Sequence, residues 1–207
     1  YGVTLGIAFS ANLFTMFIFF ELLSLSTLPL VTHKQDHESL HAGRVYAAFL
    51  FGGAALALTA VIASGLFGET GLFRYGGDLT GSFSVELMRV IFLLGFFGFG
   101  MKAAIFPFYK WLPTASCAPT PVTALLHAVA VVNTGVFAVI RLTWYAFGPE
   151  LLYGSWAQIV CIIVAAFTLL YASVLAVRER HVKRRLAYST VSNLSYMIFG
   201  IMLLTPE

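Results

Sequence analysis

Three ionisable residues stand inside segments that are otherwise apolar, and all three are of types that carry protons. Glu21 lies within "MFIFFELLSLSTLPL", Lys102 within "LLGFFGFGMKAAIFPFYKWLPTA" and His127 within "PVTALLHAVAVVNTGVF". A charge at the centre of a hydrocarbon layer costs at least about 2.5–3.5 kcal/mol, so such residues usually pair with one another or mark an ion pathway. These three residues therefore predict a buried relay for protons.

The chemistry of such a relay depends on how a lysine is balanced between two effects. Loss of hydration disfavours the charged form of a buried lysine, whereas a nearby carboxylate favours it. We therefore expect Glu21 to modulate the proton affinity of Lys102, and His127 to pass protons on. Two alternatives remain: a static Glu21–Lys102 pair that only fixes helix packing, and a neutral core histidine at 127 bonded to a backbone carbonyl.

Further polar residues in apolar segments are candidates for supporting roles. Asn133 follows His127 by almost two helical turns, and Ser189 begins a polar stretch that continues through Tyr196. We expect Asn133 and Ser189 to assist the relay, directly or through water. Hydrogen bonding between helices, with no part in proton transfer, is the alternative for both.

The elements that hold these residues follow from composition. Of 207 residues, 59% are hydrophobic and 10% are charged, whereas soluble domains carry about 25% charged residues. So few charges exclude a water-exposed domain and predict an integral, multi-pass membrane protein in a lipid bilayer. The net charge of +3 is small and its basic residues cluster in connecting segments, so we expect no nucleic-acid partner. Cys117 and Cys161 give no disulfide framework.

Apolar segments of about 20 residues cross a bilayer core as helices. The predicted spans are 13–32, 45–67, 87–108, 119–142 and 154–177, with a shorter, more polar sixth at 186–204 and the end of another at 1–11. None of these runs alternates as a barrel strand would. The predicted fold is an all-α, polytopic transmembrane helix bundle, and the abrupt apolar start suggests a piece of a longer protein. Small residues are expected to let the helices approach closely, at Gly52, Gly53, Gly95, Gly98 and Gly100.

The connecting segments predict an orientation. Segments 33–44, 109–118 and 178–185 carry eight basic residues, whereas the other connections carry only three, Arg74, Arg89 and Arg141. The positive-inside rule assigns the three basic segments to the cytoplasmic or equivalent side. The membrane would be a bacterial-type cell membrane or an organellar inner membrane.

Two local patterns in and near these connections have competing interpretations. His33, His37 and His41 have the spacing of one helix face, which suits metal binding, but the charged residues around them favour a solvated loop. Pro107 is predicted to end the Lys102 helix a little over one turn after the lysine, because proline disrupts helix interiors. Broken helices beside charged groups are a recurring device in transporters.

Three motifs in order resemble a known family. The stretch "MKAAIFPFYKWLPTASCAPTPVTALLHAVAVVNTGVFAVIRL" resembles the central signature of antiporter-like membrane subunits of respiratory complex I (NADH:quinone oxidoreductase) and of Mrp-type cation/proton antiporters. "FELLSLSTLPL" and "KRRLAYSTVSNLSYMIFG" are similar to two further motifs of that family. The resemblance implies one proton-antiporter-like transmembrane domain over residues 1–207, containing the first of two inverted repeats, with a broken helix, and the start of the second.

The resemblance also implies roles for individual residues. Glu21 would pair with Lys102, and His127 would link that lysine to a central hydrated chain. Lys183 would be the basic residue of the family's Lys-Arg pair.

The implied function is proton translocation within an NADH:quinone oxidoreductase-like, redox-driven pump. The alternatives are a subunit of an Mrp-type Na⁺/H⁺ antiporter or of a membrane-bound hydrogenase, or a scaffold whose ion pair does no work. We expect no cofactor in this chain, because it lacks phosphate-binding loops, Fe–S cysteine clusters and haem motifs. Quinone, flavin and Fe–S groups would belong to partner subunits, so this chain would be a non-redox, ion-translocating subunit among other membrane subunits.

Overall fold

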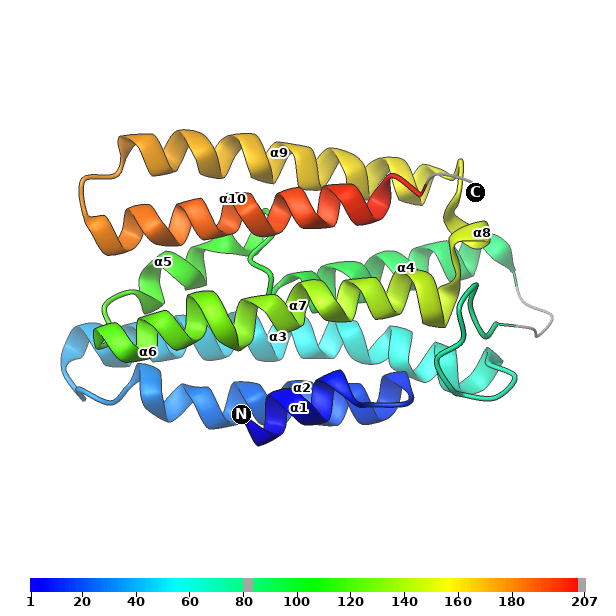
Figure 1. Cartoon of the computed structure of the whole chain (residues 1–207), viewed down its shortest axis with the longest axis horizontal. Helices are drawn as coiled ribbons and strands as arrows, with labels where there is room; N and C mark the ends of the chain where they lie inside the picture. The colour runs from blue at the N-terminus through cyan, green and yellow to red at the C-terminus, as the bar shows by residue number, and fades with distance from the viewer. Residues whose placement is uncertain (80–83, 205–207) are drawn as a thin grey trace.

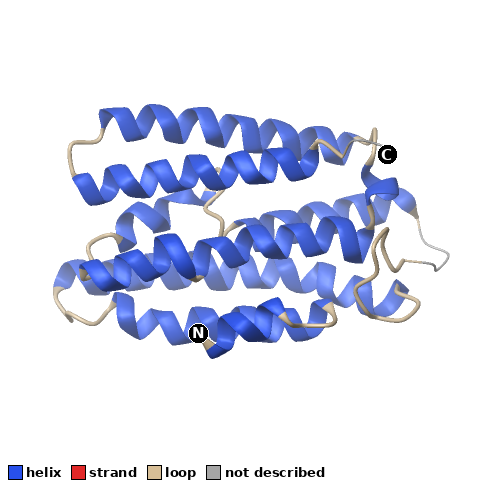
Figure 2. Cartoon of the chain, in the orientation of Figure 1, coloured by secondary structure: helices blue, strands red, loops and turns tan. Residues whose placement is uncertain are grey.

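The structure is a computed structural model that describes residues 1–79 and 84–204. Its elements are helices, and one isolated antiparallel bridge pairs Gly68 with Leu79 (Figure 2). The α-helices are α1 (Gly2–Ala8), α2 (Leu13–Val31), α3 (His37–Phe67), α4 (Val85–Gly100), α5 (Trp111–Ala115), α6 (Thr120–Ala124), α7 (Val131–Ile140), α8 (Pro149–Leu152), α9 (Trp156–Arg178) and α10 (Val182–Met202). A 3₁₀ turn, η1 (Phe108–Lys110), and two π-helical turns, η2 (Leu125–Val129) and η3 (Arg141–Phe147), extend α5, α6 and α7. The predicted all-α fold is confirmed.

Three of the long helices begin at polar caps. The side chain that precedes each helix accepts a hydrogen bond from the backbone amide three residues further on. The acceptor is Asn12 for α2 (2.7 Å), Asp36 for α3 (2.8 Å) and Ser155 for α9 (3.3 Å). Such caps satisfy amides that have no partner inside the helix. Hydrogen bonds from Ser39 hold the pKa of Asp36 below its usual range. The predicted connection 33–44 extends too far toward the C-terminus, because α3 already begins at His37.

Four helical runs among the described residues are long and apolar enough to cross a membrane. They are Leu13–Val31, His37–Phe67, Thr120–Phe147 and Trp156–Arg178, and each overlaps a predicted span. Helix α4 has 16 residues, which is short for a span, and the 21-residue α10 is more polar than the others. The total of five to six spans therefore stays a prediction.

The predicted span 87–108 is wrong as a single helix. Helix α4 ends at Gly100, seven residues before Pro107, and a tight turn that includes Ala104 at φ +57° interrupts the helix before the chain continues toward α5. The amide of Ile105 donates to the carbonyl of Gly100 at 3.3 Å, which closes this turn. A Cβ at position 100 would lie 2.5 Å from Cδ1 of Ile105, so the glycine leaves room for that side chain within the turn.

The bundle has three tiers in Figure 1: the α9–α10 hairpin, then α4, α5 and α7, then α3 with α2 and α1. The α2–α3, α5–α6 and α9–α10 connections all lie at the left end of the view. Contacts join them there: Lys34 donates to the carbonyl of Cys117 at 3.4 Å, and Lys183 donates to that of Ala118 at 3.1 Å. The three basic connections therefore share one end of the bundle, as predicted.

Helices α3 and α4 approach closely through small residues. A Cβ atom on Gly98 would lie 2.7 Å from the carbonyl oxygen of Gly53, and one on Gly95 would lie 2.6 Å from the side chain of Ala60. These positions confirm the predicted use of glycine. Gly52 makes no such approach among the described residues, because a Cβ there would meet none of their atoms within 4 Å.

Candidate functional site

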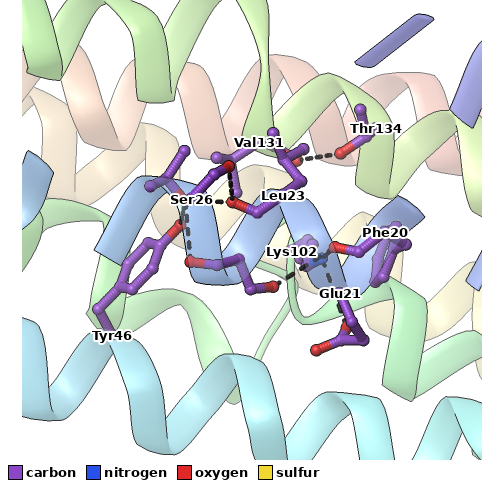
Figure 3. Close-up of polar contacts among 10 residues, drawn as sticks. Phe20, Glu21, Leu23, Ser26, Tyr46, Lys102, Val131 and Thr134 are labelled. Atoms are coloured by element: carbon purple, nitrogen blue, oxygen red, sulfur yellow. Dashed lines mark hydrogen bonds and ion pairs between the residues drawn. The ribbon is translucent and has the colours of Figure 1, made fainter. Parts of the chain in front are cut away.

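Lys102 lies in the turn that follows α4, with only 1% of its surface exposed. Its Nζ is 3.5 Å from Oε1 of Glu21 on α2 and donates a hydrogen bond to the carbonyl of Phe20 (Figure 3). The same ammonium lies over the ring of Phe20, 3.3 Å from the ring centroid. Helix α2 thus supplies a carboxylate, a carbonyl and an aromatic face, each of which stabilises a positive charge.

Glu21 is the less deeply buried partner, with 18% of its side chain exposed. Its Oε1 is buried and has no hydrogen-bond partner among the described residues, although the Lys102 ammonium lies within ion-pair distance. Buried polar atoms are nearly always hydrogen-bonded, so an exception calls for an explanation. The ion pair with the Lys102 ammonium is the explanation that the described residues offer for this oxygen.

Other helices hold the turn that carries Lys102. The indole of Trp111 donates to the carbonyl of Met101 at 2.8 Å, and the amide of Phe106 donates to Oγ1 of Thr168 on α9 at 3.0 Å. These bonds satisfy backbone groups that a continuous helix would have paired internally, as an apolar interior requires. Lys102 therefore stands on a non-helical segment that side chains from two directions fix in place.

A row of hydroxyl groups, which the sequence analysis missed, runs along α2 from the lysine. Ser24 Oγ lies 3.5 Å from the carbonyl oxygen of Phe20, Thr27 Oγ1 lies 3.2 Å from the carbonyl oxygen of Ser24, and Thr27 Oγ1 lies 2.6 Å from the hydroxyl of Tyr46. The spacing of Phe20, Ser24 and Thr27 is that of one helix face, which the sequence does signal. Tyr46 comes from α3, and nothing in its own segment indicates this partner.

His127 lies in the π-helical turn η2 and is half-buried. Its Nδ1 is 2.7 Å from the carbonyl oxygen of Thr123, and its Nε2 is 3.5 Å from Oγ of Ser116. A carbonyl can only accept, so Nδ1 carries a hydrogen and Nε2 faces the Ser116 hydroxyl. The bond at Nδ1 is the one expected of a neutral core histidine bonded to a backbone carbonyl. Nε2, by contrast, faces a hydroxyl group with which it can exchange a proton.

His127 and Lys102 do not touch within the described part of the chain. The helical run that carries His127 reaches the lysine at Gly135, where a Cβ atom would lie 2.9 Å from the carbonyl carbon of Lys102. Eight residues separate His127 from Gly135, which corresponds to roughly 12 Å along a helix. The hydrogen bonds and ion pair of Lys102 go to Phe20 and Glu21, whereas those of His127 go to Thr123 and Ser116.

The remaining predicted residues lie outside this centre. Asn133 is exposed and donates to the carbonyl of Ala128 on its own helical run at 2.7 Å. Lys183 is exposed at the start of α10 and contacts the α5–α6 connection through Ala118. Ser189 is exposed on α10. The structure brings Glu21 and Lys102 together but not these three.

The histidines of the α2–α3 region do not form a metal site in the described residues. His33 lies in the connection, and His37 and His41 lie on the first turns of α3. Across residues 1–79 and 84–204, no group of three or more His, Cys, Asp or Glu side chains is arranged to hold a metal ion. The lack of a cofactor in this chain stays a prediction.

Curated proteins similar to this chain include a component of a hydrogenase and a protein named as an antiporter subunit. Hydrogenase-4 component B of Escherichia coli is 33% identical over 191 residues, which cover 92% of this chain and 28% of that protein. The Staphylococcus aureus protein named "Putative antiporter subunit mnhA2" is 32% identical over 199 residues, which cover 94% of this chain and 24% of that protein. This chain thus spans about a quarter of the length of these relatives.

The fold of this chain also matches that of a chain in a solved structure. A chain of the Mrp complex from a Dietzia species superposes with a TM-score of 0.81 at 26% identity, over 99% of this chain and 22% of that one. The profile of the family described as "NADH:quinone oxidoreductase/Mrp antiporter, TM" matches residues 10–207. The chain therefore belongs to the NADH:quinone oxidoreductase/Mrp antiporter transmembrane family, and it is part of an integral, multi-pass membrane protein.

Proposed function

We propose that this chain is the proton-translocating part of a larger membrane subunit, with Lys102 as the proton carrier and Glu21 as the group that sets its proton affinity. One observation carries the proposal: a lysine that is 1% exposed has the carboxylate of Glu21 3.5 Å from its ammonium. The lysine stands on a non-helical turn beside α2, and a small movement of that turn changes the distance to Glu21.

The expected size of this effect follows from Coulomb's law. At an effective dielectric constant of about 20, doubling a separation of 3.5 Å removes roughly 2 kcal/mol of attraction between two unit charges. That is a change of more than tenfold in the equilibrium between the protonated and the neutral lysine. A movement of a few ångströms is enough to load or unload the carrier.

His127 is the proposed next station of the relay. The distance of roughly 12 Å along the helix calls for bridging water molecules, and polar groups are needed to hold them. Asn133, Lys183 and Ser189 keep supporting roles in this proposal, acting through water or through the helices they belong to. The hydroxyls of Thr27 and Tyr46 are an additional polar branch near the lysine.

The energy source is proposed to be a redox reaction in partner subunits, as in an NADH:quinone oxidoreductase-like pump. Electron carriers such as flavin, Fe–S clusters and quinone would sit in those partners, and this subunit would receive a conformational or electrostatic signal. The similarity to a hydrogenase component supports a redox-driven complex. The similarity to mnhA2 and to the Mrp complex favours the alternative, a subunit of a Na⁺/H⁺ antiporter.

Proton uptake into inverted membrane vesicles tests the proposal. The full-length protein and its Lys102→Ala variant are compared by fluorescence quenching, first with NADH and then with an imposed Na⁺ gradient. Quenching with NADH that is lost in the variant supports a redox-driven pump. A response only to the Na⁺ gradient, also lost in the variant, supports the antiporter.

Lys110→Ala is the matched control, because Lys110 is an exposed lysine eight residues further on. It should transport at the wild-type rate under both driving forces. A Lys102→Ala variant that assembles normally and still transports protons at the wild-type rate contradicts the proposed function and leaves the Glu21–Lys102 pair as a structural contact.

A further inference from the structure

A polar cavity of about 600 Å³ opens at the end of the bundle where the three basic connections meet. The first turn of α3 contributes Glu38, the α5–α6 connection contributes Ser116 and Cys117, and residues 181–184 at the start of α10 complete the lining. The charged or titratable groups that face it are Glu38, Cys117, His181, Lys183 and Arg184. The cavity is large enough to hold several water molecules.

Ser116 connects this cavity with His127. Its side chain is almost fully buried, with 3% of the residue exposed, although it belongs to the cavity wall. Its hydroxyl donates to the carbonyl of Leu112 at 3.2 Å, and its oxygen lies 3.5 Å from Nε2 of His127. One hydroxyl group therefore separates cavity water from the exchangeable nitrogen of the histidine.

The hydrogen-bond pattern suits both charge states of His127. With Nδ1 fixed on the Thr123 carbonyl, protonation adds a hydrogen at Nε2, which donates to Ser116 Oγ while the serine still donates to Leu112. In the neutral imidazole, Nε2 is an acceptor, and the serine hydroxyl rotates to donate to it. The distance of 3.5 Å is at the long end for a hydrogen bond, and rotation of either group shortens it.

Neighbouring hydrogen bonds also hold the segment that carries His127. Lys183 donates from the cavity side to the carbonyl of Ala118 at 3.1 Å, and the hydroxyl of Thr123 donates to that same carbonyl at 3.1 Å. The carbonyl of Thr123 in turn holds Nδ1 of His127. Lys183 thereby joins α10 to the segment that holds the imidazole of His127. This contact connects the predicted residue Lys183 with the relay.

We propose that Ser116 is the proton-transfer link between this cavity and His127, so that protons pass between water and the relay through its hydroxyl. In the inward step, a hydronium ion in the cavity gives a proton to Ser116 Oγ while the serine hydroxyl proton passes to Nε2 of His127. An O–H bond of the hydronium ion and the original serine O–H bond break, a new serine O–H bond and an N–H bond form, and water and the protonated imidazole result, with no change in oxidation state. The inference rests on the proposed function, since it names where protons join the relay.

The test compares Ser116→Ala, Ser116→Thr and the control Ser195→Ala in the full-length protein, assembled in its membrane complex. Ser195 is a buried serine on α10 that bonds only within its own helix, to Val191 at 2.8 Å. Proton uptake in vesicles should fall at least about tenfold in Ser116→Ala, because a positioned donor and acceptor is lost. Ser116→Thr, which keeps the hydroxyl, should restore most of the rate, and Ser195→Ala should match the wild type.

A second readout reports on the imidazole itself. In ¹⁵N-histidine-labelled protein in bilayers, the Nε2 resonance of His127, assigned by its loss in His127→Gln, should shift in Ser116→Ala and not in Ser195→Ala. A Ser116→Ala protein with wild-type transport and an unshifted resonance overturns the inference. Equal loss of transport in the Ala and Thr variants, with assembly intact, also overturns it, because the hydroxyl is then not what matters.

Failure of the proposed function and failure of this inference give different patterns of transport in the Lys102→Ala and Ser116→Ala variants. If Lys102→Ala transports normally while Ser116→Ala does not, the lysine carrier is refuted and the link from the cavity to His127 stands. If Lys102→Ala abolishes transport and Ser116→Ala leaves it unchanged, the lysine carrier stands and the link is refuted.

Discussion

At the scale of single residues, the Glu21–Lys102 pair differs from the surface ion pairs of the same chain. Arg74 and Glu69 lie 3.1 Å apart, but both side chains are 57% exposed, and such pairs contribute about 0–1 kcal/mol. Lys102 has no access to bulk water that could replace its partner. Removing one member of a buried pair costs far more than the pair gains over apolar residues, because a charge is left without a partner.

The first prediction compares the loss of one member of the buried Glu21–Lys102 pair with the loss of both. Glu21→Gln should lower the free energy of unfolding by about 3 kcal/mol and abolish transport, because the ammonium loses its carboxylate partner. The double variant Glu21→Gln with Lys102→Met should recover most of the stability but none of the transport. Thermal unfolding followed by intrinsic fluorescence, beside vesicle proton uptake, measures both effects.

Glu69→Gln is the matched control for this prediction and should change neither quantity. A double variant that transports protons would show that the pair is a structural contact. A single variant as stable as the wild type would show that water reaches the lysine.

At the scale of elements, the site depends on where α4 stops. The sequence predicts that Pro107 ends this helix, yet it ends at Gly100, where a tight turn packs Ile105 against the glycine. Two other helices then fix this turn, α9 through Thr168 and α7 through Gly135. The position of the lysine is therefore a property of three elements together.

Thr168 tests the contribution of α9. Thr168→Val keeps the shape of the side chain but removes the oxygen that accepts the Phe106 amide. A buried amide without a partner costs about 1–3 kcal/mol, so we expect a lower melting temperature and faster hydrogen exchange in the segment around residue 106. Thr168→Ser should behave like the wild type, and a valine variant with unchanged exchange would contradict this account.

Gly135 tests the contribution of α7. A Cβ at this position would lie 2.5 Å from the backbone nitrogen of Ala103, so Gly135→Ala must displace the turn that carries Lys102. We expect proton uptake to fall although no ionisable group has been changed. Gly200→Ala is the control, because a Cβ there meets nothing within 4 Å. Equal transport by both alanine variants would show that the turn tolerates movement.

At the scale of the whole molecule, the basic connections, the cavity and His127 belong to one end of the bundle, while Lys102 lies within it. Cys117 is a native probe of that end, because it lies in the α5–α6 connection and lines the cavity. Partial burial, followed by the carboxylates of Glu38 and Asp36, raises the pKa of its thiol. Only the thiolate reacts with alkylating reagents.

This gives a prediction on sidedness and pH. A membrane-impermeant maleimide should label Cys117 only from the cytoplasmic or equivalent side, and should leave the fully buried Cys161 unlabelled. Because the raised pKa lowers the thiolate fraction, labelling should be slow near neutral pH and should accelerate as pH rises beyond the ordinary thiol range. Glu38→Gln should speed it at a fixed pH, whereas Cys117→Ser removes the signal. Labelling from the opposite side would invert the predicted orientation.

The sequence alone determined the membrane class, the helical fold and the identity of the buried charges. Those features depend on local composition, because apolar runs of fixed length and charges within them are properties of consecutive residues. The end of α4 at Gly100, the separation of His127 from Lys102, and the contacts of Ser116, Tyr46 and Thr168 were decided by the tertiary structure. Each depends on which helix packs against which, and residues far apart in the chain carry no local signal of that partnership.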